Sequence, residues 1–143
     1  MVRRANVPTV SVPCACHSSY FLSFIFLDPE RTGDAPTMLV TTADKSPGFW
    51  GRPEEARSAI FRSEDCAQSW QRAADGLPEE LPHMVNMLVN HPSDRNAAFA
   101  GLGSLRRGVK SQGTLIATRD RGASWLRLPL EVPPVLGLWA APE

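Results

Sequence analysis

Short runs of apolar and β-branched residues, separated by turn-forming residues, recur along the 143-residue chain. The first run, residues 20–27, is aromatic and β-branched, and it predicts a strand buried on both faces. Three further runs follow at 37–42, 58–62 and 69–72. After a linker rich in Pro and Glu, the pattern restarts with runs at 85–90, 97–102, 113–117 and 124–128. The pattern therefore predicts an all-β protein that contains two antiparallel four-stranded units.

A second repeated pattern supports this division of the chain. The order apolar-x-x-apolar-x-x-x-Pro starts at Leu22, at Val85 and again at Val135. Thirteen prolines and ten glycines interrupt the chain often enough to argue against long helices. We expect an irregular N-terminal segment, two complete units and the first strand of a third unit, spanning residues 1–19, 20–74, 75–130 and 131–143.

An octapeptide occurs twice, ending at Trp70 and Trp125, which are 55 residues apart. Both copies read [Ser/Thr]-x-Asp-x-small-x-Ser-Trp. An Asp side chain can accept hydrogen bonds from backbone N–H groups ahead of it, and a buried Trp can anchor a hairpin. We therefore expect two tight turns in which the aspartates are structural. The repeated positions are Ser63, Asp65, Ser69 and Trp70 in the first copy, and Thr118, Asp120, Gly122, Ser124 and Trp125 in the second.

The two octapeptides resemble the Asp-box, Ser-x-Asp-x-Gly-x-[Ser/Thr]-Trp, also called the BNR repeat. This repeat occurs in sialidases, sortilin-type receptors and photosystem II assembly-factor-like proteins, where it joins the third and fourth strands of a β-propeller blade. The first copy departs from the pattern at Ala67, where a left-handed Ala would cost about 1 kcal/mol. Closed propellers have about four to eight blades. The resemblance thus implies a partial propeller, completed by the remaining blades of a longer chain or by self-association.

In an up-and-down blade, successive loops alternate between the two ends of the strands. The long irregular loops 43–57, 74–83 and 103–113 then share the end opposite the octapeptides, and binding residues often lie on such loops. An exposed Trp beside an Arg could stack on a sugar ring or a peptide, or the aromatic pair could fold back and pin the loop. The basic cluster could bind an anion or be a solvated loop. The candidate ligand-contacting residues are Phe49, Trp50, Arg52, Arg106, Arg107 and Lys110.

No residue is assigned a catalytic role. Sialidases that carry Asp-boxes use an Arg-Ile-Pro motif and a Tyr–Glu pair, whereas this chain has no such motif and one tyrosine, Tyr20. We expect a non-catalytic scaffold, or a fragment of one, that binds a protein or a glycan. The alternative is a fragment of a sialidase-like glycoside hydrolase that lacks its catalytic residues.

Composition narrows the classes of partner. Fifteen basic and fifteen acidic residues give a net charge of zero, so we expect no nucleic-acid partner. No stretch approaches the roughly 20 apolar residues that cross a bilayer, so we expect no membrane partner either. Cys14, Cys16 and His17 lie close together, but a zinc site needs about four ligands, and we expect neither metal nor cofactor. We take the cytoplasm as the default compartment.

Overall fold

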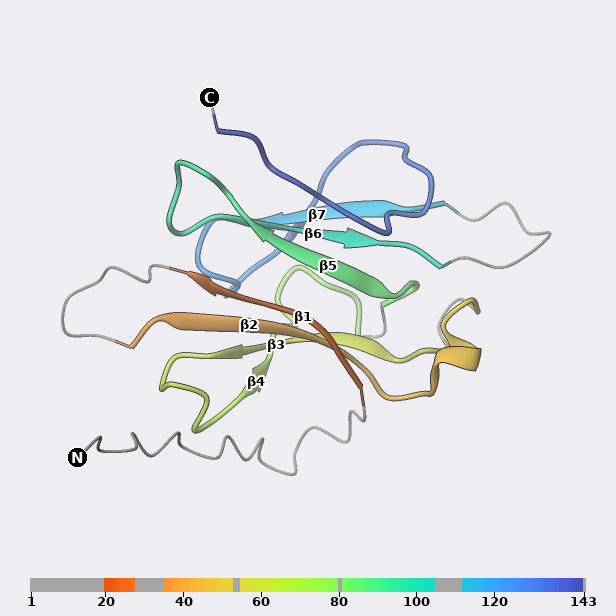
Figure 1. The fold of residues 1–143 in the computed structure, drawn as a ribbon, viewed down its shortest axis with the longest axis horizontal. Helices are drawn as coiled ribbons and strands as arrows, with labels where there is room; N and C mark the ends of the chain where they lie inside the picture. Colours follow the sequence, from red (N-terminus) through yellow and green to blue (C-terminus); the bar gives the residue numbers. More distant parts are fainter. Residues whose placement is uncertain (1–19, 28–34, 53–54, 80, 105–111, 143) are drawn as a thin grey trace, which may run out of the picture.

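The computed structural model describes residues 20–27, 35–52, 55–79, 81–104 and 112–142. Within them the chain forms two four-stranded antiparallel sheets, each with its strands in sequence order (Figure 1). The prediction of an all-β protein with two such units is confirmed. A single turn of 3-10 helix, η1 (Pro47–Phe49), interrupts the long connection between the second and third strands. The first sheet contains β1 (Tyr20–Leu27), β2 (Thr37–Ala43), β3 (Ser58–Ser63) and β4 (Gln71–Arg72), and the second contains β5 (Val85–Asn90), β6 (Ala98–Leu102), β7 (Thr114–Thr118) and β8 (Leu126–Arg127).

The fourth strand of each sheet is shorter than the apolar pattern predicts. The expected strand at 69–72 is reduced to β4, and the expected strand at 124–128 is reduced to β8. The cause is local, because the backbone N–H of Ser69 is donated to an Asp side chain in the preceding turn. A residue whose N–H closes the turn has no donor left for the sheet ladder.

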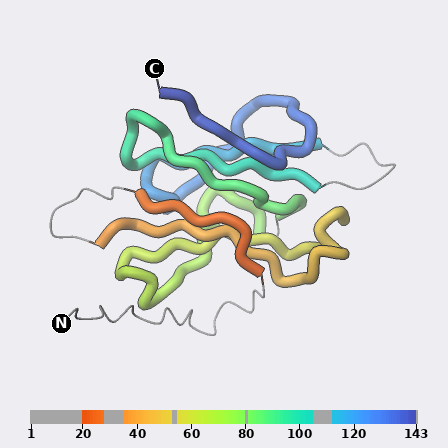
Figure 2. Tube along the Cα trace, in the orientation of Figure 1, coloured from red at the N-terminus to blue at the C-terminus, as the bar shows by residue number. Residues whose placement is uncertain are grey.

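The two sheets pack face to face, with β1 and β5 side by side (Figure 2). One apolar cluster fills the space between them, and Leu27, Leu39 and Val85 are fully buried in it. Hydrogen bonds also cross this interface, since the Val85 N–H donates to Ser58 Oγ at 3.0 Å and the Leu88 N–H donates to Ser23 Oγ at 3.2 Å. The sheets therefore form one packed body.

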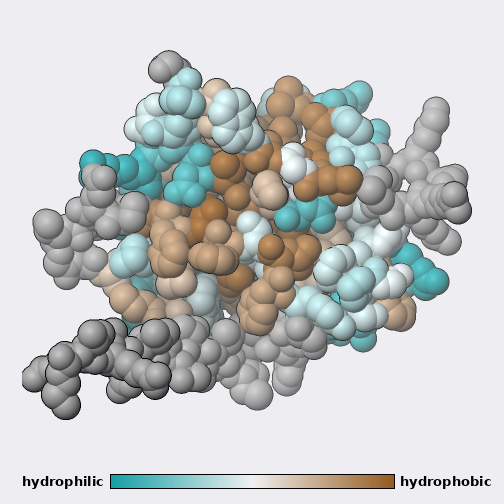
Figure 3. Space-filling view, viewed as in Figure 1, coloured by the Kyte–Doolittle hydropathy of each residue, from teal (hydrophilic) through white to brown (hydrophobic). Residues whose placement is uncertain are grey.

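The prediction that residues 20–27 form a strand buried on both faces was wrong. The β1 strand is not buried on both faces, because Phe24 and Phe26 point away from the core and are 64% and 42% exposed. Their rings contact each other edge to face at 5.8 Å. Only the alternate residues of β1, such as Ile25 and Leu27, pack toward the second sheet. Figure 3 shows hydrophobic residues gathered in the middle of the side that carries β1 and β5.

Residues 131–142, here called the C-terminal segment, cross the outer face of the second sheet (Figures 1 and 2). The Val135 N–H donates to the Leu102 carbonyl at 3.2 Å, and Asn86 Nδ2 donates to the Val135 carbonyl at 2.7 Å. The segment forms no strand beyond one isolated bridge between Val132 and Gly113. The expected first strand of a third unit is thus not formed.

Among the described residues, the structure contains no helix with the length and apolar character required to span a membrane.

Candidate functional site

The first turn, residues 63–70, is closed by the Asp65 carboxylate. Asp65 Oδ1 accepts the Ser69 N–H at 2.8 Å and Asp65 Oδ2 accepts the Ser69 hydroxyl at 2.5 Å. Ser63 Oγ donates to Asp65 Oδ1 at 2.9 Å and accepts the Ala67 N–H at 3.0 Å. Cys66 and Ala67 both have left-handed backbones, with φ of 57° and 66°. The aspartate is thus fully engaged in holding the turn.

The second turn, residues 118–125, repeats the same bonds. Asp120 Oδ1 accepts the Ser124 N–H at 2.9 Å, and the Gly122 N–H donates to Thr118 Oγ1 at 2.8 Å. The left-handed pair here is Arg121 and Gly122, with φ of 58° and 80°. The two octapeptides therefore fold into the same turn.

The hydrogen bonds of the turns also stabilise the ionised aspartates. Donation from the Ser69 hydroxyl and N–H lowers the pKa of Asp65 from 3.8 to about 2. Burial raises the pKa of Asp120, but hydrogen bonds from Ser124 and Thr118 outweigh it and leave that pKa below its ordinary value. An acid held ionised in this way is a poor proton donor near neutral pH, which fits a structural role.

The tryptophans that end the two turns differ in burial. Trp125 is 4% exposed and belongs to the core between the sheets, whereas Trp70 is half-buried. Neither indole N–H has a hydrogen-bond partner within the described part of the chain. Each Trp therefore contributes through packing, and only Trp125 joins the two sheets.

The loop at 43–57, here called the insertion, lies at the opposite end of the strands from the two turns (Figure 1). Trp50 folds back in it, since its Nε1 donates to the Lys45 carbonyl at 2.8 Å and its ring meets Tyr20 edge to face at 5.8 Å. Trp50 also packs against a small cluster made by Ala43, Ala56 and Met84. Trp50 could stack on a ligand or fold back onto its own loop, and its contacts are those of a side chain that fixes the insertion to the sheet.

Phe49 and Arg52 form the exposed part of the insertion. The Arg52 guanidinium lies 5.6 Å from the centre of the Phe49 ring, and Phe49 is 41% exposed. Arg52 Nη1 also pairs with Glu55 Oε2 at 3.0 Å. The pairing with Glu55 holds the guanidinium over the ring, so these two side chains present a cationic and aromatic surface together.

The other candidate residues fall in the loop at 103–113. Arg106, Arg107 and Lys110 lie outside the described residues. The expected anion-binding patch stays a prediction.

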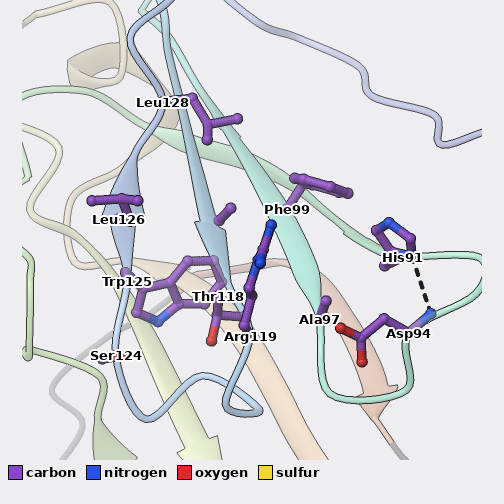
Figure 4. A pocket seen from close by; sticks show the side chains of 11 residues that line it. His91, Asp94, Ala97, Phe99, Thr118, Arg119, Ser124, Trp125, Leu126 and Leu128 are labelled. Atoms are coloured by element: carbon purple, nitrogen blue, oxygen red, sulfur yellow. Dashed lines mark hydrogen bonds between the residues drawn. The ribbon is translucent and has the colours of Figure 1, made fainter.

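A hollow of about 860 Å³ opens on the outer face of the second sheet (Figure 4). Phe99, Ala117 and Leu126 line it from β6, β7 and β8, and Arg119 and His91 also line it. The sequence did not predict this hollow, because its lining residues lie in strands and turns that carry no binding motif.

His91 in this hollow is held by its own turn. Its Nδ1 accepts the backbone N–H groups of Ser93 and Asp94, each at 3.1 Å, and its ring lies 5.7 Å from that of Phe99. The Nδ1 lone pair is thus occupied and cannot act as a proton acceptor for a substrate. His91 closes the turn between β5 and β6.

Across the described ranges, no group of three His, Cys, Asp or Glu side chains is arranged to hold a metal ion.

Comparisons with known proteins give distant matches. No family model matches the chain. The chain is 25% identical over 120 residues to vacuolar protein sorting/targeting protein 10 from Aspergillus clavatus, an alignment that covers 84% of this chain and 6% of that protein. Among solved structures, an α-L-arabinofuranosidase from Fusarium graminearum, a mutant in complex with an iminosugar inhibitor, matches with a TM-score of 0.48 and 15% identity. That match covers 78% of this chain and 31% of the other, so the chain spans less than a third of either protein.

Proposed function

We propose that the chain is part of a non-catalytic β-propeller scaffold, with the turns at 63–70 and 118–125 as its Asp-boxes. The support for this proposal is the same hydrogen-bonded turn at the same place in two stacked four-stranded sheets. Sheets of this kind, repeated around an axis, make a propeller. Because both aspartates are used to close turns, they offer no acid or base for catalysis.

We further propose that the scaffold binds a protein or a glycan through the loops 43–57, 74–83 and 103–113. The observation that supports a binding role is the Phe49–Arg52 pair, exposed on an insertion that Trp50 fixes to the sheet. An aromatic face can stack on a sugar ring or a peptide side chain, while a guanidinium can donate to its oxygens. The name of the fungal relative describes vacuolar protein sorting and targeting, which suits a binding role better than catalysis.

The proposal is tested by screening the chain against labelled oligosaccharides and peptides and measuring the affinity of any hit by calorimetry. Phe49→Ala should weaken binding about tenfold, the effect of losing roughly 1.4 kcal/mol of contact. Phe24→Ala is the matched control, because Phe24 is also exposed but lies on the outer face of the first sheet. Trp50→Ala should weaken binding indirectly, by loosening the insertion.

Two outcomes would contradict the proposal. Binding that survives both Phe49→Ala and Arg52→Ala would move the ligand site away from the insertion. Glycosidase turnover by this chain alone would contradict a non-catalytic scaffold.

A further inference from the structure

The connection between β5 and β6, residues 91–97, is here called the histidine turn, because His91 closes it from both ends. The Nδ1 of His91 accepts the backbone N–H of Ser93 and that of Asp94, each at 3.1 Å. The backbone N–H of His91 donates to the Ala97 carbonyl at 3.0 Å. One residue thus holds the start and the end of the turn.

Only the neutral side chain of His91 can make the two Nδ1 bonds. A neutral imidazole that accepts at Nδ1 carries its proton on Nε2, whereas an imidazolium carries a proton on both nitrogens and accepts at neither. A proton on Nδ1 would point at two N–H donors, so it can be added only when Ser93 and Asp94 are released. The closed histidine turn therefore requires a neutral ring.

The repeated pattern puts a different residue type at the equivalent place in the first unit. The residue before Pro is Asp28 in the first copy of the apolar-and-Pro pattern and His91 in the second. A carboxylate remains an acceptor at neutral pH, whereas histidine is the side chain that ordinarily changes its charge between about pH 5 and pH 8. The second unit therefore has a proton-sensitive acceptor at a place where the first unit has a carboxylate.

The charged neighbours of His91 among the described residues belong to types that ordinarily keep their charge in that range. Asp94 and Arg95 lie in the histidine turn, and Arg119 of the second turn lines the hollow together with His91. Phe99, whose ring contacts the imidazole, is uncharged, and β5, β6 and β7 contain no charged residue. Because carboxylates and guanidiniums ordinarily titrate outside this range, a change near the ring between pH 5 and 8 is assigned to His91.

The histidine turn is bonded to the second turn and forms part of the wall of the hollow. The Arg121 N–H donates to the Asn96 carbonyl at 2.9 Å, and Arg121 is one of the two left-handed residues of the second turn. His91, Asp94 and Ala97 line the hollow (Figure 4). A change in the histidine turn therefore reaches both the second turn and the hollow.

We propose that the histidine turn is a pH-dependent switch, closed when His91 is neutral and open when its Nδ1 is protonated. Opening releases the N–H groups of Ser93 and Asp94 and loosens the contact between the Asn96 carbonyl and the second turn. The shape of the hollow changes with it. The inference concerns a conformational change and does not depend on ligand binding at the insertion.

The experiment measures the exchange of backbone amides with solvent by NMR, as protection factors corrected for the intrinsic exchange rate at each pH. An unperturbed histidine is half-protonated near pH 6.5, so about one tenth of it is charged at pH 7.5 and about nine tenths at pH 5.5. Proton binding to the open turn then raises its population about tenfold over this interval. We expect the protection of Ser93 and Asp94 to fall about tenfold, and that of Arg121 to fall in the same direction. The protection of Ala67, in the first turn, should change by less than about twofold.

His91→Asn is the matched variant, because an Asn side-chain carbonyl can accept the same N–H groups and does not titrate. In this variant the protection of Ser93 and Asp94 should vary by less than about twofold between pH 7.5 and 5.5. His83→Gln is the control, since His83 is the other histidine in the described part of the chain. It should keep the tenfold fall.

Three results would overturn the proposal. Unchanged protection of Ser93 and Asp94 in the native protein would mean that the turn stays closed at pH 5.5. An equal fall in His91→Asn would assign the change to another group. The imidazole ¹⁵N shifts of the native protein supply a measurement that needs no variant. If His91 gains its second proton and both amides keep their protection, the Nδ1 bonds do not hold the turn in solution.

Discussion

Gly122 is the position where the contact between the two sheets can be tested most sharply. Its φ of 80° is left-handed, and the space beside its Cα is filled by Leu39. Gly122→Ala therefore adds a methyl group where both the backbone and the neighbour oppose it. Ala67, the equivalent residue of the first turn, already carries such a methyl group at a φ of 66°.

Two terms set the cost of Gly122→Ala. A left-handed L-residue costs about 1–2 kcal/mol, of which about 0.4–1 kcal/mol is recovered because alanine restricts the unfolded chain. A methyl group 2.5 Å from Leu39 Cδ2 must push the side chain aside, and overpacking of this kind costs about 1–3 kcal/mol. We therefore expect Gly122→Ala to destabilise the protein by roughly 1–5 kcal/mol. The reverse change, Ala67→Gly, should be nearly neutral, because the relief of strain is offset by chain entropy and by the loss of about 0.8 kcal/mol of methyl burial.

A double-mutant cycle isolates the overpacking. Leu39→Ala alone should cost about 2–5 kcal/mol, since Leu39 is fully buried. In Leu39→Ala the space beside Gly122 is empty, so the added methyl group should meet no obstacle. The double variant should therefore be about 1–3 kcal/mol more stable than the sum of the two single changes predicts.

The assay is urea unfolding followed by circular dichroism, with free energies extrapolated to water. Additivity of the two changes within about 0.5 kcal/mol would refute the reasoning, because it would mean that the second turn does not touch Leu39 in solution. If Gly122→Ala costs no more than the strain of its left-handed backbone, the second turn likewise does not touch Leu39 in solution.

Three further predictions concern the turns and the core. Asp65 has a folded pKa below its ordinary value of 3.8, so its contribution to stability is present above that pH and is lost as the pH falls toward about 2. The free energy of unfolding, measured as the pH is lowered, should show this loss in the native protein and not in Asp65→Asn. The same pH dependence in both proteins would contradict the prediction. In urea unfolding, Trp125→Ala should cost about 3–5 kcal/mol and Trp70→Ala at most about 2 kcal/mol, because only Trp125 is fully buried. A larger cost for Trp70→Ala than for Trp125→Ala would contradict the burial of Trp125 in the core. Ser58→Ala should cost about 1–3 kcal/mol because it leaves the buried Val85 N–H without its acceptor, and a neutral change would mean that this bond is absent.

Much of the fold was predictable because its signals are local. The run at 20–27 and the runs after it specify strands through their β-branched and aromatic residues, and the bounds of β1 and β5 match the prediction. In each octapeptide the bonds that close the turn, from the last Ser to the Asp and around the first Ser or Thr, lie within eight residues. Hydrogen bonds made between neighbours in sequence do not depend on the rest of the molecule.

The sequence by itself therefore determined which runs form β1 to β8, their order and the two repeated turns, but not the lengths of β4 and β8. Only the tertiary structure decided that Trp50 turns inward to Tyr20, that Phe24 stays exposed and that the Phe99–Ala117 pair lines a hollow. These features depend on what lies beyond each side chain: Trp50 meets Tyr20, 30 positions away, whereas Phe24 meets solvent. The sequence pattern around an apolar residue is the same whether a neighbouring sheet buries that residue or leaves it exposed to solvent.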